Sequence, residues 1–471
     1  MKTLKKGIAL LALLLFALSL YSGCQIGADD TESRTYQSSG EVWNCGFGRR
    51  QIIPDENGDG PLYIAGYQNG VEITGVLDYC EARAVWIDTG AKGVLLIGID
   101  CVGLDSGTVA KIRSSLAGIP NCASINIYST HTHAGIDTLG LWGPIGVDGK
   151  NDAYMDNLIT AAVEAGREAA ENTTSGSLYY GFVETSEMYR DSRNPQVYDA
   201  NLYQLRFSPD DGSAGIRLYF YGAHAESLRG DNTMLSRDFA GILCDRMQEV
   251  TGDNTMFFPG AIGGLIMTKA FVENTTTGAQ MNLRLTGDKL VMYAKMIYPG
   301  REQELSPKLT VSRVDFTIPM DNTVFMLYKY LGILTNQVAE ADSATGYGCR
   351  TELSVVMLDD IALTLIPGEI FPELVYGGKF GDANPDGENP LTLTEIAEAY
   401  GIRKLLVVGL ANDEIGYIVP PSDFLVNEKL PYLERVMDKK GEDHYEETNS
   451  LGPKSAVCIA DAFRSALAAI H

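Results

Sequence analysis

Histidine is scarce in this chain of 471 residues, and its placement indicates a site for metal binding or proton transfer. Two of the five histidines form Thr130-His131-Thr132-His133, directly after an apolar strand predicted over 124–128. That position is the carboxyl end of a strand, where α/β proteins place their sites. Alternate residues of an extended segment point opposite ways, so one imidazole could bind a metal while the other transfers protons. Taken alone, the pair would be better explained as two hydrogen-bonded loop histidines.

Three other side chains extend this candidate set. His224 follows a predicted strand, Glu369 ends an apolar run, and Tyr417 lies just past a buried strand. Two imidazoles, a carboxylate and a phenol make a nitrogen and oxygen ligand set that suits zinc and leaves room for water. Spacing alone leaves a purely structural role open for each of them.

The elements that must position these residues predict one large α/β unit. Apolar runs covered on both faces alternate with amphipathic helices, and a hairpin intrudes at Asp359-Asp360. The fold class we predict is α/β, with mixed β-sheets flanked by helices in a single large domain over 41–471. The predicted strands cover 93–100, 124–128, 217–221, 355–358, 361–366 and 404–410, and the predicted helices cover 106–116, 158–172 and 456–470.

The composition is that of an ordinary globular protein with a strong acidic excess. Hydrophobic residues make up 45%, and 37 Lys and Arg stand against 61 Asp and Glu, a net charge of −24. Such a chain repels phosphate backbones, so nucleic acid is excluded as a partner. The cysteines show no CxxC pair, which argues against a cysteine zinc site and a disulfide framework.

The N-terminus predicts export. Residues 1–23 combine three lysines with an apolar run of signal-peptide length, and Ser22-Gly23-Cys24 resembles a bacterial lipobox. We therefore expect a lipoprotein signal peptide over 1–23, a lipidated Cys24 and a flexible tether over 24–40. The protein would then sit in the cell envelope, lipid-anchored to the membrane surface. An uncleaved membrane anchor is the alternative.

Six segments occur in an order that resembles the neutral/alkaline ceramidase family. They read GVLDYCEARAVWIDTG, STHTHAG, YGAHAESL, IPGEIF, GLANDEIGY and HYEETNSLGP. The resemblance covers most of 41–460. It implies a zinc-dependent hydrolase that cleaves a linear amide, the N-acyl bond of a lipid-like or small substrate, by zinc-activated water.

The resemblance also implies roles for individual residues. The zinc ligands, for one ion per chain, fall on His131, His224, Glu369 and Tyr417. The catalytic residues fall on His133, which could protonate the leaving amine, and on Arg193 and Tyr445, which could donate to the tetrahedral oxyanion.

The chain departs from the family in two places. The family carries a Gly-Asn/Asp-x-Ser-Pro-Asn-like segment with a proposed catalytic serine, and here the chain reads GAIGGLIMT from Gly260, with Ile266 as our match to that serine. The family's C-terminal β-sandwich is not expected, because the chain ends soon after Pro453. Two alternatives to the amidase therefore stay open: a zinc-dependent esterase or other acyl hydrolase, and a ligand-binding lipoprotein without catalysis.

Two acidic segments resemble the first half of a calcium loop. Asp55-x-Asn57-x-Asp59-Gly60 and Asp382-x-Asn384-x-Asp386-Gly387 both lack the acid expected at the twelfth position. Ca²⁺ is thus a possible second ion, and ordinary acidic turns are the preferred interpretation.

Overall fold

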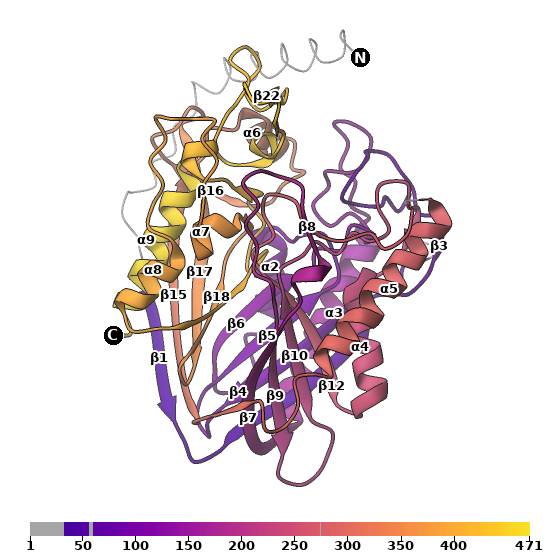
Figure 1. Cartoon of the computed structure of the whole chain (residues 1–471), viewed down its shortest axis with the longest axis vertical. Helices are drawn as coiled ribbons and strands as arrows, with labels where there is room; N and C mark the ends of the chain where they lie inside the picture. Colours follow the sequence, from indigo (N-terminus) through magenta and orange to yellow (C-terminus); the bar gives the residue numbers. More distant parts are fainter. Residues whose placement is uncertain (1–32, 56–59, 274) are drawn as a thin grey trace.

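A computed structural model describes residues 33–55, 60–273 and 275–471. In this part of the chain, two large β-sheets face each other, and helices cover their outer faces (Figure 1). The fold is therefore α/β with mixed sheets and flanking helices, as the sequence predicts.

The larger sheet has nine strands and carries the histidine-bearing segments. Its order is β12-β10-β9-β7-β2-β4-β5-β6, and the ninth strand, β14, pairs with β7 outside this order. The β5–β6 and β10–β12 pairs are parallel and the other pairs are antiparallel. The strands are β2 (Trp43–Gln51), β4 (Glu81–Asp88), β5 (Gly93–Ile99), β6 (Cys122–Ser129), β7 (Thr173–Glu184), β9 (Asn201–Pro209), β10 (Ile216–Tyr221), β12 (Asn254–Pro259) and β14 (Gln303–Leu305).

The smaller sheet has six strands and leads to Glu369 and Tyr417. Its order is β1-β15-β17-β18-β20, with β16 paired to β17, and only β18 and β20 run parallel. The strands are β1 (Ser33–Ser39), β15 (Lys308–Pro319), β16 (Gln337–Glu340), β17 (Tyr347–Leu358), β18 (Ile361–Leu365) and β20 (Lys404–Val408). Four short pairs lie outside both sheets: β3 (Gly75–Val76) with β11 (Met234–Leu235), β8 (Tyr189–Asp191) with β13 (Ile266–Thr268), β19 (Glu369–Ile370) with β21 (Tyr417–Ile418), and β22 (Val436–Met437) with β23 (Asp443–His444).

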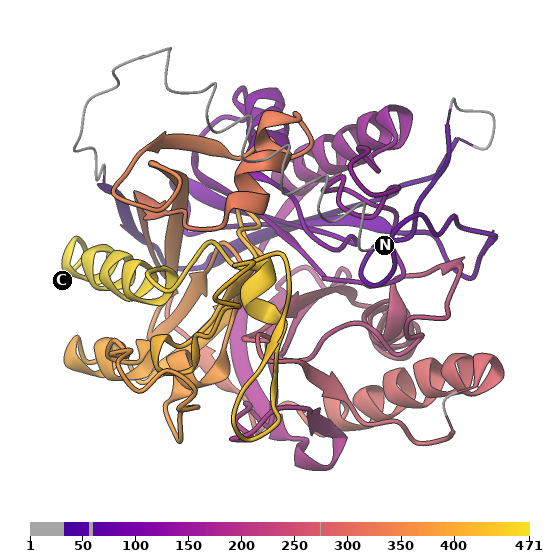
Figure 2. The same ribbon diagram turned by 90° about the horizontal axis from the view of Figure 1, so that it is seen from above.

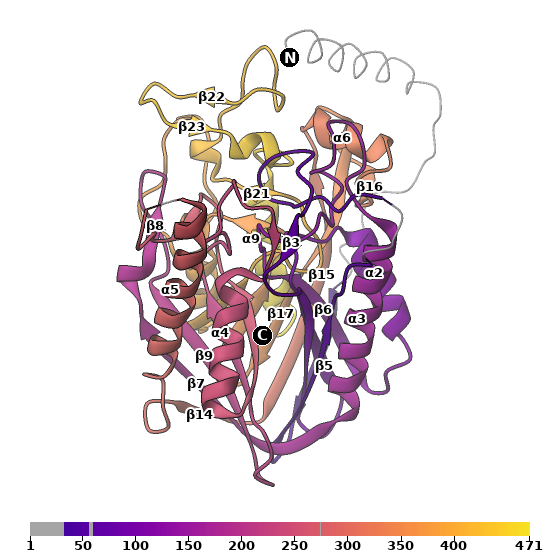
Figure 3. The same ribbon diagram turned by 90° about the vertical axis from the view of Figure 1, so that its right-hand side faces the viewer.

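The helices complete a four-layer arrangement of helix, sheet, sheet and helix (Figures 2 and 3). One group covers the larger sheet and the other covers the smaller sheet, while aliphatic side chains of both sheets share the central core. The first group is α2 (Ser106–Leu116), α3 (Asp152–Glu171), α4 (Asp238–Thr251) and α5 (Thr276–Ala294), and the second is α7 (Pro372–Tyr376), α8 (Leu393–Ala399) and α9 (Ser455–Ala468). The remaining helix, α6 (Thr323–Tyr330), lies at the end of the molecule that also carries β21 and β22 (Figure 3).

Each predicted element is present, most of them close to the expected bounds, but β17 begins at Tyr347 and not at 355, and α3 begins at Asp152 and not at 158. The buried strand over 93–100 is β5, the helix over 106–116 is α2, and the hairpin around Asp359-Asp360 is the β17–β18 pair. Asp105 caps α2, since its carboxylate accepts from the Thr108 N–H at 2.9 Å. The sequence therefore identifies most of the elements that lead into the site.

The N-terminal expectations are tested only in part. The predicted signal peptide and Cys24 lie outside the described residues. Residues 33–39, which we expected to belong to the tether, form the edge strand β1, paired antiparallel with β15. No helix in the described part of the chain combines the length and apolarity that crossing a bilayer requires.

Candidate metal centre

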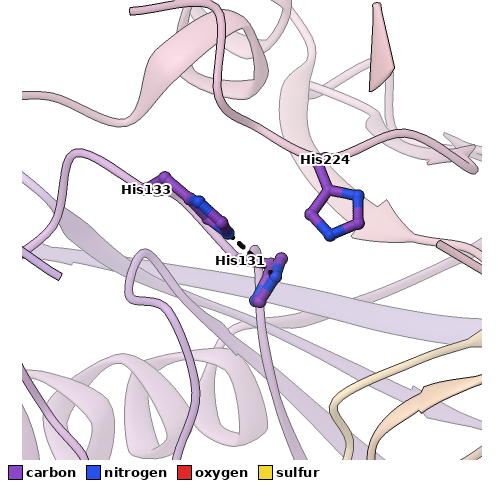
Figure 4. A group of neighbouring side chains, drawn as sticks. All are labelled: His131, His133 and His224. Atoms are coloured by element: carbon purple, nitrogen blue, oxygen red, sulfur yellow. Dashed lines mark hydrogen bonds between the residues drawn. The ribbon is translucent and has the colours of Figure 1, made fainter. Parts of the chain in front are cut away.

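His131 and His133 lie beyond the end of β6, and both rings reach the same point (Figure 4). Their Nε2 atoms are 3.0 Å apart. The expectation that alternate side chains diverge is wrong here, because His131 has a φ of 61°, a left-handed conformation that breaks the extended alternation. Nonglycine residues adopt this conformation rarely, and it is often found at functional sites.

His224 joins this pair from the end of β10, which lies in the same sheet. One nitrogen each of His131, His133 and His224 lies within 4.8 Å of the others. In the described residues this is the only gathering of three or more histidine, cysteine or acidic side chains close enough to hold one ion. Imidazole is the commonest metal-binding side chain in proteins.

Two of the three rings are oriented by backbone carbonyls. His131 Nδ1 lies 2.6 Å from the carbonyl oxygen of Val102, and His224 Nδ1 lies 2.8 Å from that of Ile266. A carbonyl oxygen only accepts, so each Nδ1 carries the hydrogen and donates it. In their neutral forms, His131 and His224 therefore have the lone pair on Nε2, which faces the centre of the cluster, and this is the tautomer that metal ligation requires.

Glu369 closes the cluster from the smaller sheet. Its Oε2 atom lies 3.0 Å from His224 Nε2 and 3.4 Å from His131 Nε2. A carboxylate oxygen facing two lone pairs at such distances is stable only with a proton or a cation between them. The donor set of imidazole nitrogens and a buried carboxylate therefore fits a borderline divalent ion such as zinc.

The charges of the cluster are strongly coupled. Burial acts to raise the pKa of Glu369, but the neighbouring charges and hydrogen bonds of His131 and His224 hold it well below its usual range. Burial acts to lower the pKa of His224, but its hydrogen bond to Glu369 together with the charges of Glu369 and Glu226 outweighs that effect and raises it. Burial, reinforced by the other two imidazoles, lowers the pKa of His133, so His133 is neutral at pH 7.

Tyr417 and Tyr445 form a phenol pair next to Glu369. The parallel β19–β21 register sets Tyr417 directly beside Glu369, and side chains of paired residues share one face. The two phenol oxygens are 2.8 Å apart. Burial raises the pKa of both phenols well above the ordinary value, so both stay protonated and able to donate.

Arg193 lies outside the histidine cluster. Its guanidinium pairs with Asp423 at 2.8 Å and with Glu446 at 2.7 Å, and it stands over the ring of Phe371 at 5.2 Å. Both acids are buried, and the donation to the oxyanion that the resemblance implies for Arg193 stays a prediction. The ion pair with Glu446 anchors the segment that carries Tyr445, because Glu446 is the next residue.

The match of Ile266 to the family's serine needs correction. The Ile266 side chain is buried in the core with Tyr189, Tyr221 and Phe239, so it does not line the metal centre. Counting the family's segment from Gly260 places the serine at Gly263, whose N–H donates to the Ile370 carbonyl oxygen at 2.9 Å. A Cβ atom there would stand 2.6 Å from the Glu369 carbonyl oxygen, so the backbone approach leaves no room for a side chain.

The structure adds two residues that we did not single out. Tyr67 donates to Glu226 Oε2 at 2.5 Å, and that same oxygen is 3.7 Å from His133 Nδ1. Glu226 Oε1 and His133 Nδ1 are both buried and have no hydrogen-bond partner among the described residues. The signal in the sequence is the carboxylate two residues after His224, which the motif YGAHAES contains.

The calcium expectation stays a prediction. Residues 56–59 of the first loop lie outside the described residues. In the second loop, Asp382 pairs with Lys440 at the surface, which is the behaviour of an ordinary acidic turn.

Two solved structures resemble the whole arrangement. "Crystal Structure Analysis of neutral ceramidase from Pseudomonas aeruginosa" matches with a TM-score of 0.69 at 16% identity, covering 94% of this chain and 75% of that chain. "Ceramidase complexed with C2" matches with a TM-score of 0.69 at 17% identity, covering 91% and 75%. No family model and no curated protein sequence matches the chain. The protein therefore has the fold of the neutral ceramidases.

Proposed function

We propose that this protein is a metal-dependent hydrolase that cleaves the amide (N-acyl) bond of a lipid-like substrate. The observation that carries the proposal is the convergence of His131, His224 and Glu369 on one point, with both imidazole tautomers fixed for ligation. The likeness to solved ceramidases supports an amide of a lipid as the substrate class.

The side chains that would hold the ion are His131, His224 and Glu369, with Tyr417 adjacent to Glu369. One zinc ion per chain would act there as a Lewis acid toward a carbonyl oxygen and a water molecule. The buried walls of the cluster keep bulk water out, which strengthens each polar contact with a developing charge.

The protein's own residues would then handle protons and orientation. Hydrolysis adds water oxygen to the carbonyl carbon and breaks the C–N bond, and the nitrogen must take a proton because an amide anion leaves badly. His133 is the candidate proton carrier, and the protonated phenol of Tyr445 is a candidate donor to the oxyanion. Arg193 would act indirectly, through the Glu446 contact that positions Tyr445.

The test combines metal analysis with a substrate panel. The purified protein, stripped by a chelator and reconstituted with zinc, should bind one ion per chain and hydrolyse an N-acyl lipid only when loaded. The panel includes the matched ester, since ester turnover without amide turnover would favour the acyl-hydrolase alternative. Full zinc loading with no turnover of any substrate would leave a ligand-binding lipoprotein in place of the enzyme.

Serine-directed reagents give a second, independent test. Gly263 and its neighbours offer no hydroxyl at the position that the family's segment indicates, so no acyl-serine can form there. We expect activity to resist acylating and phosphonylating reagents and to show no burst phase. Inactivation with stoichiometric labelling of a serine would contradict the proposed mechanism.

For location, we propose export and lipid anchoring through Cys24. The lysine-rich start, the apolar run and the Ser22-Gly23-Cys24 sequence support it. Cys24→Ala should move the protein out of the detergent phase, or leave it unprocessed with a larger mass. Identical partition and mass of the two proteins would remove this proposal.

A further inference from the structure

We propose that α6 and the neighbouring loop 140–150 form an apolar rim that docks on an uncharged lipid surface beside the metal centre. The rim is defined by Ile145, Val147, Tyr330 and Leu331. The proposal rests on the proposed function for its purpose, since a lipid amide must reach the site from an aggregate, and it is tested below by a readout that needs no catalysis.

The first observation is that α6 buries only part of its apolar surface against the protein. Its sequence is TVFMLYKY, and Val324, Phe325 and Met326 pack against the core of the smaller sheet, although none of the side chains of α6 is fully buried. This is the apolar stripe that a surface helix normally turns toward the core. The apolar side chains at the C-terminal end, Tyr330 and Leu331, remain exposed, and exposed apolar surface of this kind indicates contact with something apolar outside the protein.

The second observation is that α6 contacts both segments that carry a phenol of the site, the one with Tyr417 and the one with Tyr445. The ring of Phe325 lies against the backbone of Gly416, next to Tyr417. The N-cap residue Asn322 donates to the carbonyl oxygens of Thr448 and Ser450, in the segment that follows Tyr445. A surface that α6 contacts would therefore lie beside the phenol pair.

The third observation is the exposure of the rim itself. The exposed fractions are 62% for Ile145, 56% for Val147, 56% for Tyr330 and 49% for Leu331. The loop is held to the segment after α6 by Lys150, whose ammonium group donates to the Ile333 carbonyl oxygen. Branched aliphatic and tyrosine side chains are those that enter the boundary between acyl chains and head groups.

The charge of the protein decides which lipid surface fits. A net charge of −24 opposes an anionic membrane, so the overall charge of the protein disfavours such a surface. Docking must come from apolar burial, which is insensitive to salt. The structure thus assigns the rim to an uncharged or zwitterionic surface.

The first test places a fluorescent reporter in the rim of the full chain. Leu331→Trp should shift its emission to the blue with phosphatidylcholine vesicles, and acyl chains brominated near the head group should quench it. The matched control is Val250→Trp, at the C-terminal end of α4, where the exposed fraction is 53%. Comparing two positions in one chain removes any contribution of an N-terminal lipid anchor to vesicle binding.

The expected result is quenching at 331 that does not change with salt, and none at 250. Equal responses at both positions, or no response at 331, would overturn the proposal. A blue shift of Leu331→Trp that needs no lipid and grows with protein concentration would also overturn it, because a second copy of the chain would then cover the rim.

The second test measures whether the rim contributes to hydrolysis of a substrate held in a vesicle. The double variant Tyr330→Ser, Leu331→Ser should hydrolyse a vesicle-borne N-acyl lipid about tenfold more slowly, from the lost apolar burial. Its rate on a short-chain, water-soluble amide should match the wild type, as should that of Val250→Ser on both substrates. An equal loss on both substrates would overturn the docking role. Quenching at 331 in a protein with no turnover at all would retain the rim and reject the proposed function instead.

Discussion

The two sheets contribute different halves of the candidate site. The nine-stranded sheet supplies imidazoles, beyond β6 and β10, and two of them are oriented by backbone carbonyls. The six-stranded sheet leads into the oxygen-bearing residues Glu369 and Tyr417, which the β19–β21 register sets side by side. The three imidazoles and the pair of Glu369 and Tyr417 come from different sheets, so the complete site exists only where the sheets meet.

The largest effect should follow from removing a ligand of the larger sheet. His224→Ala leaves the buried Glu369 carboxylate without its 3.0 Å partner and removes one nitrogen from the cluster. We expect loss of stoichiometric zinc, loss of hydrolysis and a lower Tm. Metal content by mass spectrometry and thermal unfolding measure all three.

A chelator provides the control for that variant. If zinc ties the two sheets together, chelation should lower the Tm of the wild type and leave that of His224→Ala nearly unchanged. A variant with full zinc and an unaltered melting curve would show that the ligand set is wrong. Glu369→Gln tests the other sheet in the same way, and we expect the same loss of metal from it.

His133 sharpens the comparison within one sheet. It shares the cluster with His131, but no backbone carbonyl in the described part of the chain is hydrogen-bonded to its ring, and its Nδ1 faces Glu226 instead. We expect His133→Ala to keep zinc and to lower kcat by about 100-fold or more, the usual contribution of a proton carrier. The zinc content of the variant distinguishes a proton carrier from a ligand, because loss of zinc from His133→Ala would show that His133 is a ligand.

Most of the route to the site could be predicted from the sequence, and the local geometry could not. The strands that lead to His131 and His224 are apolar runs, which sequence patterns identify well. The convergence of His131 and His133 depends on one left-handed φ at His131, which the alternation of polar and apolar residues does not encode.

The position of Arg193 was beyond prediction for a related reason. Its partners Asp423 and Glu446 are 230 and more residues away along the chain, and only the packed fold brings them together. Ile266 shows the limit of matching a short segment by eye. Our match to the family's serine lay three residues too far along the chain, at a core side chain and not at Gly263.

Tyr445→Phe probes the oxygen side of the site with a smaller change. The substitution removes one hydroxyl, keeps the ring, and takes away the 2.8 Å contact with Tyr417. We expect kcat to fall by about 100-fold with unchanged zinc content, as for the loss of one oxyanion donor. An effect confined to KM would assign the phenol to substrate binding rather than to the transition state.

The smallest effect concerns Glu373 in α7, on the side of the smaller sheet. Burial, with some help from the charges of Asp191 and Asp423, raises the pKa of this carboxyl to about 8, against the partial offset of Arg193. The folded protein therefore keeps a proton on Glu373 at pH values where the unfolded chain has lost it. Wild-type stability should consequently fall as pH rises from the unfolded pKa, about 4.3, toward 8.

The variant Glu373→Gln tests this, because its side chain stays neutral throughout. Relative to the wild type, its free energy of unfolding should increase by about 1–3 kcal/mol across that pH window. Urea unfolding of both proteins at pH 5 and pH 8.5 measures the difference, and parallel pH curves would show that this carboxyl ionises normally in the folded state.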